Sequence, residues 1–136
     1  MILIIITGFL SIVSGAARAG ESFTVILDWF VNPDHAPLFV AQERGYFVQH
    51  GLEVEMIAPA DPNDPPKLVA AGQADIYPRI GRTMEWDTAA GHAIVHYAGG
   101  NVTDMDGNEL QYGNPGFENP HFIVKGPGVA KATPDS

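Results

Sequence analysis

The chain has 136 residues, 46% of them hydrophobic and 17% charged, which suits one folded domain better than two and excludes disorder as the main state. Seven Lys and Arg residues face sixteen Asp and Glu residues, and the formal charge of −9 excludes binding to nucleic acid or anionic lipid by bulk electrostatics. The 136-residue sequence contains no cysteine, which excludes disulfides, thiolate nucleophiles, zinc–thiolate sites and iron–sulfur ligands from it.

Residues 1–19 have the pattern of an export signal. Residues 2–13 are nearly all apolar, but as a helix they would span only about 18 Å, too short for a hydrocarbon core of about 30 Å. Ala17-Arg18-Ala19 supplies an A-x-A cleavage site. We therefore expect a signal peptide over 1–19 and a periplasmic or secreted mature chain. An uncleaved anchor or a buried strand is the alternative.

The next part of the chain has the pattern of a parallel α/β sheet. Residues 23–29 are β-branched and aromatic and predict a buried strand, the apolar spacing in 38–47 predicts a helix, and the alternation in 53–57 predicts a second strand. Four prolines predict a rigid loop over 59–66. A short helix and a short strand are then expected over 67–71 and 74–77.

The last part of the chain continues the alternation of helices and strands. Asp87 is a natural N-cap for a helix over 88–98, which the glycine pair at 99–100 would end. Asp106-Gly107 predicts a hairpin turn between strands at 101–105 and 109–112. Beyond residue 126 the sequence predicts no regular structure.

Four motifs lie between residues 27 and 75. They are L-D-W-F-x-N-P-D-H-A-P from Leu27, V-A-Q-E-R-G-Y-F from Val40, G-L-E-V-E from Gly51 and A-D-P-N-D-P-P-K-L-V-A-A-G-Q-A-D from Ala60. Together they resemble the beginning of the periplasmic solute-binding proteins of the thiamine-pyrimidine type. That resemblance implies an export signal, a two-lobed fold, and capture of a pyrimidine precursor of thiamine for an ABC permease.

A second set of motifs begins within the first. It comprises V-A-A-G-Q-A-D-I-Y-P-R from Val69, T-M-E-W-D-T-A-A-G from Thr83, A-G-G-x-V-T-D-x-D-G from Ala98 and N-P-H-F-I-V from Asn119. This set resembles the C-terminal end of metal-dependent phosphatases of the inositol monophosphatase superfamily, the bacterial bisphosphate nucleotidases in particular. Residues 86–100 fit the second signature of that superfamily.

Both resemblances accept residues 68–75, so we expect a fusion of two fragments with an α/β fold. The expected parts are the start of a periplasmic-binding-protein lobe (βαβ) at 20–72, the C-terminal αβ portion of an inositol-monophosphatase-like fold at 73–126, and a disordered tail at 127–136. Both folded parts are expected to be incomplete. Because each would lack strands, self-association through unpaired edges is a further expectation.

The resemblance to solute-binding proteins makes the loop after the first strand a candidate ligand wall. Trp29 would stack on a flat pyrimidine, and Asn32 and His35 would hydrogen-bond ring nitrogens or an exocyclic amine. The alternative from the residues alone is that Trp29 belongs to the core and that Asn32 only turns the chain.

The resemblance to phosphatases makes Asp87 a metal ligand, provided that a complete site is supplied. Mg²⁺ usually needs about six oxygen ligands, and the Glu-Glu and Asp-Pro-x-Asp-Gly-Thr motifs that contribute carboxylates in the family are absent here. A plain N-cap contributing about 1 kcal/mol is therefore the favoured role of Asp87. Arg79 and Arg82 would face either a phosphate or solvent, and His92 and His96 are expected to face solvent.

The main functional interpretation is a truncated, exported solute-binding protein for uptake of a thiamine pyrimidine precursor, without a cofactor and not functional alone. Its partners would be a pyrimidine-type ligand and an ABC permease. The alternative is a fragment of a cytoplasmic, Mg²⁺-dependent phosphatase of the inositol monophosphatase family that acts on 3'-phosphoadenosine phosphates.

Overall fold

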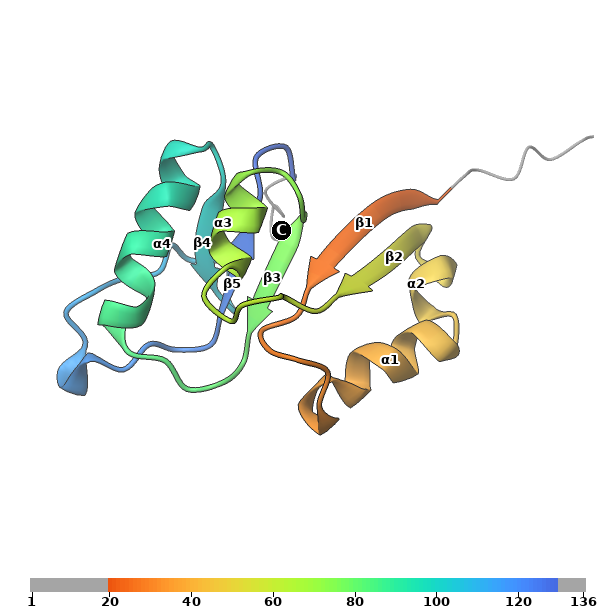
Figure 1. Cartoon of the computed structure of the whole chain (residues 1–136), viewed down its shortest axis with the longest axis horizontal. Coiled ribbons are helices and arrows are strands. Elements are labelled where there is room, and N and C mark those ends of the chain that lie inside the picture. The colour runs from red at the N-terminus through yellow and green to blue at the C-terminus, as the bar shows by residue number, and fades with distance from the viewer. Residues whose placement is uncertain (1–19, 130–136) are drawn as a thin grey trace, which may run out of the picture.

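The computed structural model describes residues 20–129, which form a mixed α/β structure (Figure 1). The strands are β1 (Glu21–Ile26), β2 (Leu52–Ile57), β3 (Ile76–Arg79), β4 (Asn101–Asp104) and β5 (Phe122–Lys125). The helices are α1 (Ala36–Glu43), α2 (Tyr46–Gln49), α3 (Pro65–Ala70) and α4 (Glu85–Tyr97), with 3₁₀ turns η1 (Pro33–His35) and η2 (Pro115–Phe117). The predicted signal peptide over 1–19 and residues 130–136 of the predicted tail lie outside the described residues. None of the helices within 20–129 has the length and apolar character that a membrane crossing requires.

The five strands form one sheet in the order β2-β1-β3-β5-β4. β1 pairs in parallel with both β2 and β3, whereas β5 runs antiparallel to its neighbours β3 and β4. Four strands therefore point the same way and only β5 is reversed. The two resemblance regions contribute strands to the same sheet, because the β1–β3 pairing joins them at Val25 and Ile76.

Helices cover the sheet unevenly. Figure 1 shows α3 and α4 side by side against β3, β4 and β5, and α1 and α2 beside β2. Since β2 and β3 flank β1 on opposite sides, right-handed crossovers place α1 and α3 on opposite faces of the sheet. β1 is therefore the strand with helices on both sides, which accounts for the burial of Val25 and Ile26 at its carboxyl end.

The hydrophobic core lies between the sheet and the α3–α4 layer. Val69 of α3 and Val95 of α4 are both fully buried there, and Ile26 reaches the same cluster from β1. The cluster comprises Ile26, Val69, Ala74, Tyr77, Val95, Val102, Leu110, Phe122 and Val124. Residues from before and after position 67 thus share one core.

The close approach of α3 and α4 depends on a glycine. A Cβ atom added at Gly91 would lie 3.1 Å from Cβ of Pro66, tighter than ordinary van der Waals contact. The small residues of α4 therefore let it pack directly against the first turn of α3. This contact fixes the first turn of α3 against the middle of α4.

Several predicted elements are shifted in the structure. α3 begins at Pro65 within the predicted loop, because proline is tolerated in the first turn of a helix, where no backbone donor is needed. The predicted hairpin after the 101–105 strand is only partly formed: Thr103 and Glu109 make an antiparallel bridge, and the N–H of Leu110 donates to the carbonyl of Val102. The strand that pairs with β4 along its length is β5. The missed strand, β5, begins within the Asn119 motif.

The predicted fold class is confirmed only as α/β. The structure does not support a separate periplasmic-binding-protein lobe, since the βαβ unit of β1, α1 and β2 completes the sheet that contains β3, β4 and β5. A βαβ unit is the common start of many α/β folds, so its sequence pattern does not distinguish one from another. Among the described residues, β2 and β4 are the edge strands of this sheet.

Candidate functional site

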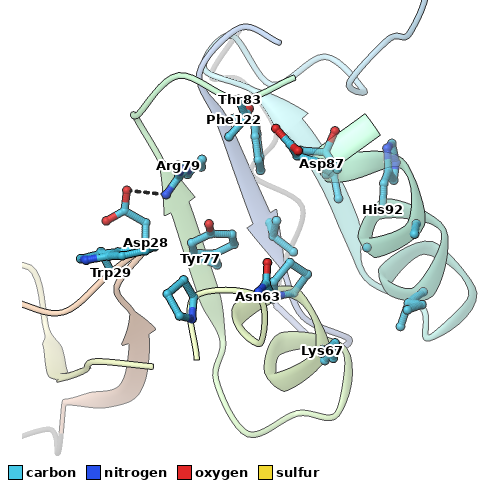
Figure 2. A pocket seen from close by; sticks show the side chains of 18 of the residues that line it. Asp28, Trp29, Asn63, Lys67, Tyr77, Arg79, Thr83, Asp87, His92 and Phe122 are labelled. Carbon is cyan, nitrogen blue, oxygen red and sulfur yellow. Dashed lines mark hydrogen bonds and ion pairs between the residues drawn. The ribbon is translucent and has the colours of Figure 1, made fainter. Parts of the chain in front are cut away.

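A cavity of about 380 Å³ opens where the carboxyl ends of β1 and β3 meet the first turns of α4 (Figure 2). In the sheet, β2 lies on one side of β1 and β3 lies on the other. The carboxyl end of β1 is therefore the topological switch point of the parallel strands, a place where α/β sheets commonly bind ligands. The side chains that matter most for its chemistry are Asp28, Trp29, Lys67, Arg79, Arg82 and Asp87.

Basic side chains gather at this cavity although the chain is acidic. Three of the five Lys and Arg residues within 20–129 line it: Lys67, Arg79 and Arg82. Each is paired with a carboxylate: Lys67 Nζ lies 2.9 Å from Asp64 Oδ1, Arg79 Nη1 lies 2.8 Å from Asp28 Oδ2, and Arg82 Nε lies 3.2 Å from Glu118 Oε2. The hydrogen bond to Asp64 also raises the pKa of Lys67.

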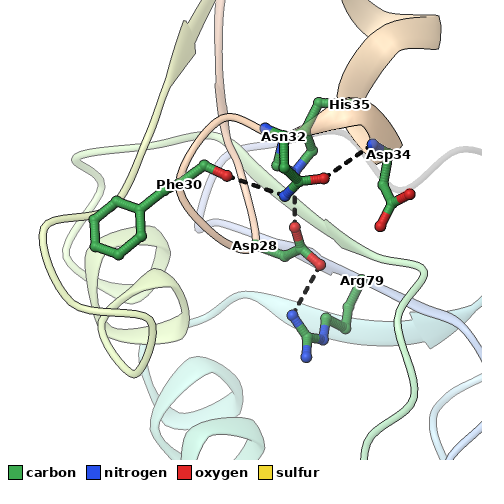
Figure 3. A network of polar contacts seen from close by, with 6 residues as sticks. All are labelled: Asp28, Phe30, Asn32, Asp34, His35 and Arg79. Atoms are coloured by element: carbon green, nitrogen blue, oxygen red, sulfur yellow. Dashed lines mark hydrogen bonds and ion pairs between the residues drawn. The ribbon is translucent and has the colours of Figure 1, made fainter.

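Asp28 is the centre of a small polar network (Figure 3). Its Oδ2 accepts from Arg79, and its Oδ1 lies 2.7 Å from Nε2 of His35. The backbone N–H of Asn32 donates to Nδ1 of His35 at 3.3 Å, so Nδ1 is an acceptor and Nε2 carries the proton that is donated to Asp28. The buried His35 therefore orients Asp28 rather than facing a ligand.

The three predicted ligand residues occupy different places. Trp29 lines the cavity, but Asn32 and His35 are absent from its wall. The Asn32 side chain caps η1: its Oδ1 accepts from the N–H of Asp34 at 2.9 Å, and its Nδ2 donates to the carbonyl of Phe30 at 3.0 Å. Sequence reasoning missed Asp28, although an acidic residue directly after a buried apolar strand is the available signal.

Asp87 lies in the first turn of α4, next to the cavity. The helix begins at Glu85 with Met84 as N-cap, so Asp87 is its third residue and not the predicted N-cap. Its Oδ2 accepts the backbone N–H of Met84 at 2.9 Å, which satisfies one of the donors at the helix start. Asp87 therefore stabilises the start of the helix from its third position and not as the predicted N-cap.

The described residues do not form a metal centre by themselves. Within 20–129, no group of three His, Asp or Glu side chains is arranged to hold an ion. Mg²⁺ prefers about six oxygen ligands, and Asp28, the other carboxylate on the cavity wall, is occupied by Arg79 and His35. Asp87 therefore offers one carboxylate, which does not fit Mg²⁺ without further ligands.

Glu85 holds the loop before η2 against α4. Its carboxylate accepts the backbone N–H of Gly113 at 2.8 Å and that of Asn114 at 2.7 Å, together with the Asn114 side-chain amide. The bond from Gly113, followed by that from Asn114, lowers the pKa of Glu85. A carboxylate used in this way is an anchor and not a proton donor.

His92 differs from the expectation of two solvent-facing histidines. Its side chain is only 10% exposed, lines the cavity, and has Nδ1 2.9 Å from the hydroxyl of Tyr112. Burial lowers the pKa of His92, which keeps the imidazole neutral at pH 7. His96, one turn further along α4, is exposed as predicted.

The fold and cavity define a mixed α/β domain with a cation-lined site at its switch point, and comparison with known proteins identifies the family of its C-terminal region. Residues 67–133 match the inositol monophosphatase family. The 3'(2'),5'-bisphosphate nucleotidase CysQ of Salmonella typhimurium is 55% identical over 58 residues, which cover 42% of this chain and 24% of that protein. The C-terminal region of this chain therefore belongs to the inositol monophosphatase family.

A solved structure extends the match to most of the chain. The crystal structure of CysQ from Bacteroides thetaiotaomicron, a bacterial member of the inositol monophosphatase family, superposes with a TM-score of 0.62 and 36% identity. It covers 81% of this chain and 39% of that chain, so the likeness reaches well upstream of residue 67. A putative thiamine biosynthesis protein of Haemophilus influenzae is 35% identical over 117 residues, covering 74% of this chain but 37% of that protein.

These findings contradict the main functional interpretation of the sequence. The family match and the structural match both point to the phosphatase family and not to exported solute-binding proteins. The expected ABC permease partner and pyrimidine ligand depended on the solute-binding interpretation and are therefore not supported. The resemblance of the N-terminal half is not confirmed, since the thiamine name comes from a relative of which this chain covers about a third. The predicted alternative, an inositol monophosphatase family member, is the better description.

Proposed function

We propose that this chain is the C-terminal, ligand-binding part of a phosphatase of the inositol monophosphatase family and that its cavity binds nucleoside bisphosphates. The observation that carries the proposal is the gathering of Lys67, Arg79 and Arg82 around one cavity in a chain with a charge of −9. The name of the Salmonella relative supports the ligand class. This chain spans only 24% of that relative, so the activity of the whole enzyme is part of the proposal.

The cations at the cavity have the chemistry that phosphate esters require. Guanidinium groups offer forked donors to phosphate oxygens, and an ammonium adds a point charge. The Nε atom of Arg79 is buried and has no hydrogen-bond partner within the described residues. A buried donor left unpaired costs about 1–3 kcal/mol, so an acceptor supplied by a ligand at this wall would be stabilising.

Hydrolysis needs more than the described residues provide. A Mg²⁺ ion would polarise the phosphoryl group and activate water, and Asp87 is the residue of this chain that would contribute a carboxylate to it. Because no three ligands gather within 20–129, we expect the chain to bind bisphosphates without turning them over. The remaining ligands would come from the part of the family that this chain does not span.

Calorimetric titration of the full chain tests the binding proposal. Adenosine 3',5'-bisphosphate should bind at least tenfold more tightly than adenosine, because only the former offers phosphate oxygens to the cations. Arg82→Gln and Lys67→Gln should each weaken the bisphosphate, whereas Arg44→Gln, an exposed cation outside the cavity, should not. Equal affinity for adenosine and its bisphosphate would overturn the proposal.

A phosphate-release assay tests the expectation that the chain binds bisphosphates without hydrolysing them. With Mg²⁺ and adenosine 3',5'-bisphosphate, the chain alone should release no phosphate above the buffer rate. Release that disappears in Asp87→Ala would show that the 136 residues contain a complete metal site, and would contradict our expectation.

A further inference from the structure

The cavity has an aromatic wall that lies outside the family-matched region. Trp29 follows β1 and lines the same cavity as the three cations, although the match to the inositol monophosphatase family begins only at residue 67. Its side chain is about half exposed, at 49%. A large apolar ring at the rim of a cation-lined cavity is a feature that binding sites share.

The position of Trp29 is fixed by its neighbours. Phe30 packs edge-on against it, with ring centroids 5.8 Å apart and an interplanar angle of 78°. The preceding residue, Asp28, is bound by both His35 and Arg79, so the backbone that carries the indole is anchored to β3 (Figures 2 and 3). The indole and the Arg79 guanidinium are therefore held on one wall of the cavity.

The second tryptophan provides a contrast. Trp86 is 67% exposed and pairs with Phe117, with centroids 6.2 Å apart, but it is not part of the cavity wall. Exposure alone therefore does not single out Trp29. The distinguishing features are its place on the cavity wall and its closeness in sequence and space to the Asp28–Arg79 ion pair.

We propose that Trp29 forms a base subsite, stacking on the flat heteroaromatic ring of a nucleotide whose phosphates face Lys67, Arg79 and Arg82. The proposal rests on the proposed function. It adds a contact for the base of the nucleotide, which the residues of the family-matched region do not explain. A cavity of about 380 Å³ lies within the usual size range for small-molecule sites. Offset stacking on an indole is worth a several-fold gain in affinity beyond the area buried.

Fluorescence makes the proposal testable because the chain has two tryptophans. In the Trp86→Phe variant the remaining indole is Trp29, and stacking of adenine should quench it. Adenosine 3',5'-bisphosphate should quench this variant, whereas ribose 5-phosphate, which has a phosphate but no base, should not. In the Trp29→Phe variant, where Trp86 remains, neither ligand should change the fluorescence.

Affinities separate stacking from general packing. Trp29→Ala should weaken adenosine 3',5'-bisphosphate about fivefold and leave ribose 5-phosphate unchanged, while Trp29→Phe should retain most of the affinity. The matched control, Trp86→Ala, should bind both ligands as the parent chain does. Equal weakening of both ligands by Trp29→Ala, or no weakening of either, would overturn the base subsite while leaving the proposed function intact.

Failure of the proposed function gives a different pattern. If neither phosphate ligand binds, the nucleotide proposal fails, and the subsite is then judged with adenosine at millimolar concentration. Quenching of Trp29 by adenosine would support an aromatic ring subsite without phosphate recognition. Absence of quenching would overturn the subsite as well.

Discussion

Arg79 Nη1 donates to Asp28 Oδ2 at 2.8 Å, which joins the carboxyl ends of β3 and β1 across 51 positions in sequence. Asp28 precedes the family-matched region and Arg79 lies within it. The pair therefore connects the two parts of the chain at the rim of the cavity. Because both side chains are only about a fifth exposed, water screens this interaction less than it screens a surface ion pair.

The Asp28–Arg79 pair should contribute measurably to stability. We expect a double-mutant cycle with Asp28→Ala and Arg79→Ala to give a coupling energy of about 1–2 kcal/mol in urea unfolding, because the two charges are about a fifth exposed and their interaction is only partly screened by water. The matched control is the Lys67–Asp64 pair, whose side chains are 60% and 37% exposed. Its cycle should give about 0.2–0.5 kcal/mol. Equal couplings for the two pairs would contradict the special position of Asp28.

Glu85 should make stability depend on pH in the acidic range. Its pKa is lowered from 4.5 by hydrogen bonds from Gly113 and Asn114, so the unfolded chain binds the proton more tightly than the folded chain. The resulting stabilisation is fully present above pH 4.5 and is lost as the pH falls through the folded-state pKa. Melting curves between pH 7 and pH 3 should therefore show a smaller loss on acidification for Glu85→Gln than for the parent chain.

The control for this prediction is Glu55→Gln, an exposed position on β2. It should retain the pH dependence of the parent chain. If Glu85→Gln behaves in the same way as Glu55→Gln, the loop that contains Gly113 is not held by the carboxylate.

Much of the element order and the parallel unit of β1, α1 and β2 could be predicted from sequence, but the order of the other strands in the sheet could not. The apolar pattern before residue 29 and the small residues after Asp87 indicate β1 and α4 because these signals are local. Strand neighbours depend on contacts between distant residues: Val25 pairs with Ile76, and Val102 with Val124. Local turn chemistry at Asp106-Gly107 therefore predicts the short antiparallel return after β4, but not the pairing of β4 with β5.

Only those residues of the candidate site that lie within a recognised sequence motif could be predicted. Asp87 and Arg79 lie in motifs that the family resemblance pointed to, and both line the cavity. The sequence predicts Trp29 as a contact for a thiamine pyrimidine precursor and not for a nucleotide. Its place on the cavity wall follows from the β1–β3 pairing. Asp28 has no motif of its own, because its role comes from His35 and Arg79, which reach it from separate elements.

Asn119 should position the start of α4. Its Nδ2 donates to Oγ1 of Thr83 at 3.1 Å and to Oγ1 of Thr88 at 3.0 Å, one on each side of the turn that holds Asp87. Asn119→Ala should lower the free energy of unfolding by about 1–2 kcal/mol and weaken adenosine 3',5'-bisphosphate binding. Urea unfolding and calorimetry check the two effects. Asn108→Ala, in the exposed turn after β4, should leave the nucleotide affinity unchanged.

The chain should unfold as one cooperative unit, because Ile26 of β1 and Val95 of α4 share the same core with no exposed surface. Ile26→Ala should cost about 2–4 kcal/mol. Two probes report on the two regions: Trp29 fluorescence in the Trp86→Phe background follows the end of β1, and Trp86 fluorescence in the Trp29→Phe background follows α4. Ile26→Ala should shift both urea transitions by the same amount, since one core serves both probes. A shift of the Trp29 transition alone would mean that the βαβ unit folds separately from the family-matched region, as two independent fragments would.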